Sequence, residues 1–204
     1  VSRGGLKLEQ ALKLFEIPIA GKTAIDIGAS TGGFTDCLLQ YGASKVIAID
    51  VGYGQFDWKL RTDSRVRLLE RQNIRYLTSE ALGELADLAV LDVSFISLKL
   101  VLPPTFELLK PKGEVIALVK PQFEVGKNEV EKKGIVKSLD KHLKVLLNLK
   151  EFVEPLGWYF LNLIPSPITG QKGNVEFLVH LGKENQNRLW DENAIQDVVN
   201  FDRE

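Results

Sequence analysis

Apolar residues recur along the chain with two periods, one helical and one typical of buried strands. Leu8, Ala11, Leu12 and Phe15 follow helical spacing near the start of the sequence. Seven short runs rich in β-favouring residues predict strands at 23–26, 45–50, 66–70, 85–92, 113–120, 158–164 and 174–181. Helical patterns predict helices at 34–40, 97–110, 138–155 and 193–201. Strands and helices therefore alternate over most of the chain.

This alternation predicts an α/β fold built on a doubly wound, seven-stranded, mostly parallel sheet. No helix separates the last two strands, so we expect an antiparallel last strand that pairs with its neighbour as a hairpin. We expect a helical segment at 1–20, one domain at 21–182, and a polar tail at 183–204. The connections expected within the domain are a turn at 111–113, a loop at 121–126 and a mobile charged loop at 126–137.

A glycine-rich turn joins the first expected strand to the helix at 34–40. Its sequence is Asp26-Ile27-Gly28-Ala29-Ser30-Thr31-Gly32-Gly33-Phe34-Thr35. Glycine lacks the Cβ that would keep a ligand away from the backbone, and the start of a helix presents unpaired N–H groups. Such a loop suits a nucleotide-like ligand at the edge of an α/β sheet, whereas a purely structural turn is the alternative.

The spacing of this turn narrows the choice of ligand. The phosphate-binding pattern G-x-x-x-x-G-K-[ST] is absent, and Ser30 replaces the second glycine of a dinucleotide-binding pattern. Asp26 would repel a pyrophosphate but suits an ammonium group, and Asp50 ends the next strand, where it could bind a ribose diol. These features favour S-adenosylmethionine, with its methionine end near Asp26 and its adenosine ribose on Asp50.

Polar residues follow several of the expected strands at the same end. In open α/β sheets the ligand lies outside the carboxyl ends of the strands, which share one edge. The residues expected to meet there are Asp26, Asp50, Asn73, Asp92 and Lys120, with Asn73 at the adenine rim. Asp92 and Lys120 are therefore expected beside the bound ligand.

The residues at this edge also limit the methyl acceptor. The run Asp92-Val93-Ser94-Phe95 lacks the Pro-Pro of N/D-P-P-Y/F motifs, which argues against an exocyclic amine. Cys37 is the only cysteine, so no cysteine pair can attack a pyrimidine carbon, and we expect Cys37 to serve packing. A hydroxyl acceptor must lose its proton, which a lysine can take when burial and a neighbouring cation lower the lysine pKa. Lys120 could be that base and Lys7 the cation, but on pattern alone either could be a surface lysine.

Charge and composition limit the partners. The 204 residues carry a net charge of −1, so any contact with nucleic acid needs a local patch. The one dense basic stretch contains Arg61, Arg65, Arg67, Arg71 and Arg75, which form either a solvated surface or a phosphate-contact patch. A single cysteine and the lack of a signal peptide or long apolar run predict a cytoplasmic protein that avoids membranes. The chain begins with Val1 and contains no methionine, so we expect it to be part of a longer product.

Six short motifs occur in order, at residues 2–8, 26–35, 50–55, 91–98, 119–124 and 173–176. Together they resemble the haemolysin-A (TlyA) family of ribosomal-RNA 2′-O-methyltransferases, which have an FtsJ-like catalytic domain. The resemblance covers residues 1 to about 182. It implies a catalytic tetrad of Lys7, Asp92, Lys120 and Glu176. Lys120 would accept the proton, Lys7 and Glu176 would orient the hydroxyl, and Asp92 would lie between the lysine and the methyl donor.

The resemblance implies ribosomal RNA or a ribosomal subunit as partner and a small RNA-binding domain that precedes residue 2. We expect no metal, and S-adenosylmethionine contacts at Asp26, Gly28, Ala29, Ser30, Gly32, Gly33, Phe34, Asp50, Val51, Asn73 and Asp92. A non-catalytic RNA-binding or ribosome-assembly module is an alternative. A membrane-active haemolysin is a second alternative, against which we find no amphipathic membrane helix or span in the sequence.

Overall fold

One mixed sheet organises the computed structural model, which describes residues 2–185 and 190–201. Across these residues the strand order is β3-β2-β1-β4-β5-β7-β6. The strands are β1 (Thr23–Ile27), β2 (Lys45–Ile49), β3 (Val66–Leu69), β4 (Ala86–Leu91), β5 (Leu109–Val119), β6 (Tyr159–Pro165) and β7 (Phe177–Gly182). The first five strands are parallel, and β7 runs antiparallel to both β5 and β6. The predicted seven-stranded, mostly parallel sheet with an antiparallel last strand is confirmed.

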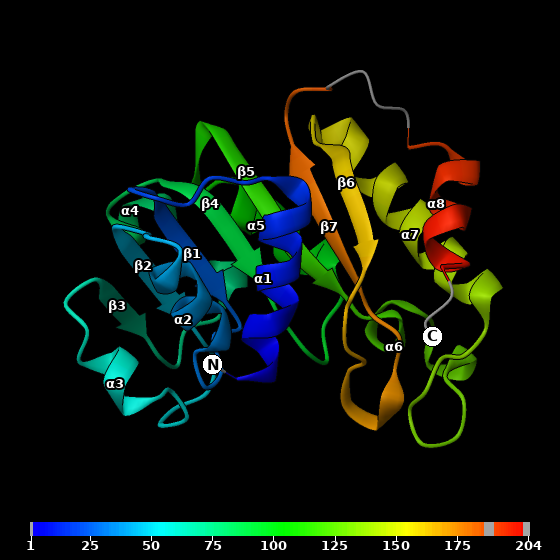
Figure 1. Cartoon of the computed structure of the whole chain (residues 1–204), viewed down its shortest axis with the longest axis horizontal. Coiled ribbons are helices and arrows are strands. Elements are labelled where there is room, and N and C mark those ends of the chain that lie inside the picture. Colours follow the sequence, from blue (N-terminus) through cyan, green and yellow to red (C-terminus); the bar gives the residue numbers. More distant parts are fainter. Residues whose placement is uncertain (1, 186–189, 202–204) are drawn as a thin grey trace.

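Helices cover both faces of the sheet (Figure 1). One face packs against α1 (Arg3–Phe15) and α2 (Gly33–Gln40), and the other packs against α5 (Leu98–Phe106), α7 (Leu139–Val153) and α8 (Glu192–Val199). Side chains of a strand alternate between faces, so Ala24 of β1 joins the core under α1 while Ile25 joins the core under α5 and α7. The sheet is therefore buried on both sides, as its near-continuous apolar strands require.

The helix predicted at 97–110 ends earlier, at Phe106. Pro103 and Pro104 lie inside α5, and proline removes the N–H that an interior turn of a helix needs. The chain then joins the sheet, because Leu109 already pairs with Ala86. The turn predicted at 111–113 is wrong in its placement, since these residues belong to β5 and form an irregularity in its pairing with β4.

Two connections are more ordered than predicted. The loop expected at 121–126 contains the short helix α6 (Pro121–Glu124). The segment 126–137, expected to be a mobile loop, contains a 3-10 turn (Lys127–Glu129) and a bridge between Glu131 and Ile135. It also packs Val136 into the interior, with 1% of that residue exposed. The last predicted strand also begins later than expected, because β7 starts at Phe177 and not at residue 174.

Both ends of the described chain pack onto the sheet. In α1, Leu8, Ala11 and Leu12 are buried, so the segment at 1–20 covers part of one face. In the tail predicted at 183–204, the expected short helix is α8, whose Ile195 and Val199 pack in the core on the opposite face. Other parts of that tail, at 186–189 and 202–204, lie outside the described residues. Within the described part of the chain, no helix is long and apolar enough to cross a membrane.

Candidate active site

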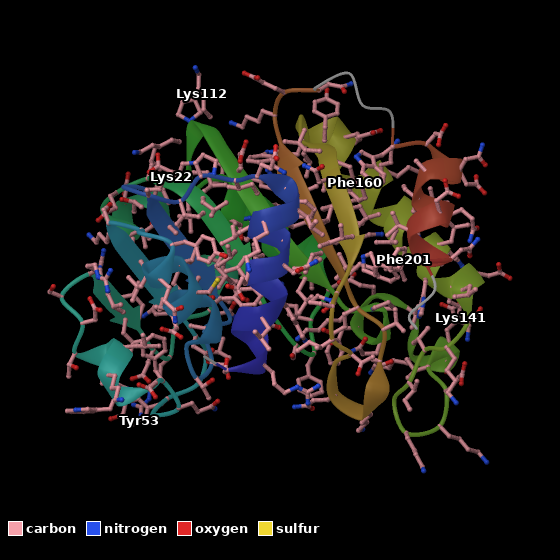
Figure 2. All side chains as sticks on the ribbon, in the orientation of Figure 1. Lys22, Tyr53, Lys112, Lys141, Phe160 and Phe201 are labelled. Atoms are coloured by element: carbon pink, nitrogen blue, oxygen red, sulfur yellow. The ribbon has the colours of Figure 1, made fainter. Side chains whose placement is uncertain are left out.

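A cavity of about 400 Å³ opens at the carboxyl ends of β1, β2 and β4. This volume falls in the usual range for small-molecule sites, which are mostly apolar with a few polar groups. Figure 2 shows Tyr53, which follows β2, at this end of the molecule and Lys112 of β5 at the opposite end. The walls include six of the predicted donor contacts, namely Gly28, Ser30, Asp50, Val51, Asn73 and Asp92. Six of the eleven residues predicted to contact the donor therefore line one cavity at the carboxyl edge of the sheet.

Gly28 lines the cavity where the end of β1 lies beside the end of β4. It has a φ of 78°, in the left-handed region that favours glycine. A Cβ at this position would lie 2.2 Å from the carbonyl oxygen of Asp92, so no side chain fits. Its N–H donates to the carbonyl oxygen of Ile49 at 2.9 Å. The absence of a Cβ at Gly28 therefore lets the end of β1 pack against the backbone at the end of β4.

Asp50 is held in place by the backbone of both glycine-rich turns. Its Oδ2 accepts a hydrogen bond from the N–H of Ser30 at 2.7 Å, and its Oδ1 accepts one from the N–H of Gly52 at 2.7 Å. A carboxylate has about four acceptor positions, so each oxygen retains capacity for a hydroxyl. The arrangement can bind a ribose diol in the cavity.

The other predicted donor contacts, which are Asp26, Ala29, Gly32, Gly33 and Phe34, are not among the residues that line this cavity. Asp26 is fully buried beneath the glycine-rich turn, where its Oδ2 accepts a hydrogen bond from Thr35 Oγ1 at 2.7 Å. Burial raises the pKa of Asp26 to about 7, and the hydrogen bond from Thr35 opposes that rise. The Oδ1 of Asp26 has no hydrogen-bond partner among the described residues. Asp26 therefore faces the underside of the loop instead of the open cavity.

The four residues of the implied tetrad form two lysine–carboxylate pairs. Lys120 Nζ lies 2.6 Å from Asp92 Oδ1, and it donates to Ser94 Oγ at 2.9 Å. Lys7 Nζ lies 2.8 Å from Glu176 Oε2, and the side chains of this pair are only 10% and 2% exposed. Asp92 and Ser94 also line the cavity, so the Lys120 ammonium lies at its rim.

Strand register brings the two pairs to the same edge of the sheet. Val119 of β5 lies opposite Phe177 of antiparallel β7, and continuing this register by one residue puts Lys120 opposite Glu176. Directly opposite residues in an antiparallel pair project to the same face. A Cβ on Gly4 would lie 3.9 Å from Asp92 Oδ2, which places the start of α1 against the end of β4. Lys7 follows one turn later on that helix.

Sequence reasoning gave no role to two residues that organise this edge. Ser94 bonds Lys120, and Glu124 joins α6 to the start of α5. Glu124 Oε2 accepts a hydrogen bond from Ser97 Oγ at 2.7 Å, and its Oε1 accepts one from the N–H of Leu98 at 2.8 Å. Burial raises the pKa of Glu124. Both residues lie inside motifs that resemble the family, and this was the one indication in the sequence that they could have a role.

The basic stretch divides into paired and unpaired arginines. Arg61 pairs with Glu70 and Arg65 with Asp63, so these two charges are balanced within the chain. Arg67 donates to the carbonyl oxygen of Leu82. The guanidinium of Arg71 lies 4.4 Å from the ring centroid of Tyr53, and that of Arg75 lies 5.7 Å from the ring centroid of Tyr76. Only the last two arginines, among the described residues, present their charge beside an exposed aromatic ring.

The sheet order, the glycine-rich turn and the cavity at the strand ends are those of a Rossmann-like fold, which the chain shares with a solved S-adenosylmethionine-dependent methyltransferase from Mesorhizobium loti. A family model described as FtsJ-like methyltransferase matches residues 1–183, and the chain belongs to this family. The cofactor of the family is S-adenosylmethionine. The site fits it, because the Asp50 carboxylate can accept hydrogen bonds from a ribose diol and side chains such as Ile74 and Val93 provide apolar walls.

Comparison with known proteins gives close relatives. YqxC of Bacillus subtilis is 53% identical over 182 residues, which cover 89% of this chain and 65% of YqxC. A Mycobacterium tuberculosis protein named 16S/23S rRNA (cytidine-2′-O)-methyltransferase TlyA is 45% identical over 199 residues, covering 98% of this chain and 74% of that protein. A solved structure from Streptococcus thermophilus matches with a TM-score of 0.92 and 48% identity, covering 98% of this chain and 72% of that one. The chain thus spans about two thirds to three quarters of these relatives.

Proposed function

We propose that this chain transfers a methyl group from S-adenosylmethionine to a ribose 2′-hydroxyl of ribosomal RNA, in the cytoplasm. The observations that carry the proposal are the Lys120–Asp92 pair beside the donor cavity and the Lys7–Glu176 pair, which strand register brings to the same edge of the sheet. A binding module needs no such set. The name of the M. tuberculosis relative supports ribosomal RNA and a 2′-oxygen as the target.

The amine of Lys120, in its neutral form, is the proposed proton acceptor. S-adenosylmethionine supplies an electrophilic methyl group on its sulfonium. A ribose hydroxyl is a poor nucleophile, so its proton must leave as the oxygen forms its bond to carbon. Asp92 and Ser94 hold the Lys120 nitrogen at the cavity rim, within 2.6 and 2.9 Å of their oxygens. The protonated lysine that results is stabilised by the Asp92 carboxylate.

Lys7 and Glu176 are proposed to orient the acceptor. The Lys7 ammonium can donate a hydrogen bond to the 2′-oxygen and stabilise the negative charge that develops on it. Glu176 is almost fully buried and fixes that ammonium at 2.8 Å. A mostly buried ion pair is rigid enough to hold a donor where charge develops, because neither side chain can move freely into water.

Arg71 and Arg75 are proposed to contact RNA phosphates beside the cavity. Unlike Arg61 and Arg65, they have no ion pair among the described residues, and unlike Arg67, which bonds a carbonyl oxygen, each lies beside an exposed aromatic ring. Phosphate contacts from arginine contribute affinity but carry no base specificity.

The test uses labelled S-adenosylmethionine with ribosomal subunits, on a form of the protein extended to the length of its relatives. The RNA is digested to nucleosides, which are separated by mass spectrometry. We expect the label in a 2′-O-methylated nucleoside. Label on a base, or none in RNA, would contradict the proposal. Leakage of liposomes at low protein concentration would instead favour the membrane-active alternative.

A further inference from the structure

We propose that Asn174 is a positioning residue that sets the Glu176 carboxylate against Lys7. Two measurements test this role: one of turnover, which rests on the function proposed above, and one of structure, which does not. Asn174 is 3% exposed and lies two residues before Glu176, in the connection between β6 and β7. Its side-chain amide joins this connection to the segment 126–137, which we call the arch.

Both polar groups of the amide bond the backbone of the arch. Asn174 Oδ1 accepts a hydrogen bond from the N–H of Val136 at 3.0 Å, and its Nδ2 donates to the carbonyl oxygen of Gly134 at 2.9 Å. One partner is a donor and the other an acceptor, so only one orientation of the amide satisfies both. The arch is itself fastened, because Glu131 bridges Ile135 and Val136 is buried. Asn174 is therefore held by a fixed part of the molecule.

The backbone of Asn174 in turn holds the residues that border Glu176. Its carbonyl oxygen accepts a hydrogen bond from the N–H of Gly170 at 2.8 Å. A Cβ on Gly170 would lie 1.9 Å from Glu176 Oε1, so the Gly170 backbone lies directly against the carboxylate. On the side of α1, Arg3 Nη2 donates to the carbonyl oxygen of Thr169 at 3.3 Å. The turn that contains Gly170 thus limits where the Glu176 carboxylate can lie.

A substitution at Asn174 should therefore reach Lys7 through Glu176. Asn174→Asp keeps the size of the side chain and the acceptor for the Val136 N–H, but it places a carboxylate oxygen against the carbonyl of Gly134. Two acceptors in contact repel, and a buried carbonyl without its donor costs free energy. We expect the turn to move away from the arch and the ion pair of Lys7 with Glu176 to weaken.

The structural measurement follows acetylation of the Lys7 amine during brief exposure of the folded chain to the reagent, and the chain is then digested so that mass spectrometry of the peptides locates the acetyl group. Lys7 should react about tenfold faster in Asn174→Asp than in the wild type, because the ion pair no longer protects it. Asn148→Asp makes the same change at an exposed position of α7 and should leave Lys7 unchanged. Asn174→Ser removes the amide without adding charge, and it replaces Asn174→Asp if that variant fails to fold. Unchanged Lys7 reactivity in a folded Asn174 variant would overturn the proposal.

The turnover measurement separates positioning from general support of the fold. Asn174→Asp should lower kcat by about 10²-fold, because a displaced catalytic group costs that much, and leave the Kd of S-adenosylmethionine unchanged. The double variant Asn174→Asp, Glu176→Gln should be no slower than Glu176→Gln alone, because both changes act through one carboxylate. Losses that multiply would overturn the proposal. If the wild type methylates no RNA, the proposed function fails, and the Lys7 measurement still decides this inference.

Discussion

Asp92 Oδ1 lies 2.6 Å from Lys120 Nζ, and the same aspartate forms part of the donor cavity wall. The Asp92 carboxylate therefore borders the cavity for the methyl donor and also contacts Lys120, the proposed proton acceptor. Asp92 follows β4 and Lys120 follows β5, and these strands are parallel neighbours. Their carboxyl ends are adjacent for that reason, so the sheet itself brings Asp92 and Lys120 together.

Replacing Asp50 should weaken binding of the methyl donor. In Asp50→Asn one oxygen becomes an NH2 group, which faces a backbone N–H of Ser30 or Gly52 and cannot accept from it. We expect the Kd of S-adenosylmethionine, measured by calorimetry, to rise by about 10- to 100-fold, in line with the loss of a charge-assisted hydrogen bond. Asp140→Asn, at an exposed position of α7, is the matched control. Equal affinity in the two variants would show that Asp50 does not hold the donor.

Because of Asp26, the free energy of unfolding should decrease as the pH is raised toward 7. Its pKa is about 7 in the folded chain, whereas the ordinary value is 3.8. Between these values the folded state holds more protons than the unfolded state, so raising the pH favours unfolding until about pH 7 and has no further effect through this group above it. Asp26→Asn should gain stability relative to the wild type across this interval, by roughly a few kcal/mol at pH 8 compared with pH 4. Denaturant unfolding at several pH values measures the difference, and parallel curves for the two proteins would refute it.

Glu124 should matter for turnover although it is not proposed to touch the substrate. Its carboxylate joins the connection after β5, which carries Lys120, to the start of α5 through Ser97 and Leu98. Glu124→Gln keeps the volume but turns an NH2 group toward one of two donors, at a cost of about 1–3 kcal/mol in the free energy of unfolding. We expect kcat to fall together with this loss of stability, because Lys120 and Asp92 lie on the two connections that Glu124 joins. Glu107→Gln, at the exposed end of α5, should change neither quantity.

The fold was readable from the sequence because its signals are local and mutually consistent. Each buried strand is a short apolar run, and the acids at 26, 50 and 92 mark strand ends that one parallel sheet brings to one edge. The ends of helices and strands were harder to predict where strand pairing overrides the local preference for a helix. Leu109 belongs to β5 because it pairs with Ala86 of β4, although the sequence around Leu109 predicts a helix.

The pair of Lys7 with Glu176 could be assigned only through resemblance. Lys7 lies on the face of an ordinary amphipathic helix, and no local pattern links it to Glu176, which is 169 positions away. The same limit applies to Asp26, whose position before a glycine-rich turn suggested contact with the ligand. Its side chain points to the face covered by α2, where Thr35 bonds it, and side-chain direction within a strand depends on register as well as sequence.

The most direct test of the account compares Lys120→Ala with the wild type in methyl transfer from labelled S-adenosylmethionine to ribosomal subunits. Donor binding is measured in parallel, and Lys112→Ala, at the exposed opposite end of the sheet, serves as control. We predict that Lys120→Ala loses label in RNA by at least about 10³-fold while it retains the donor Kd, because removing the acceptor for the proton affects chemistry and not binding. Label in RNA at the wild-type rate from Lys120→Ala would contradict the account.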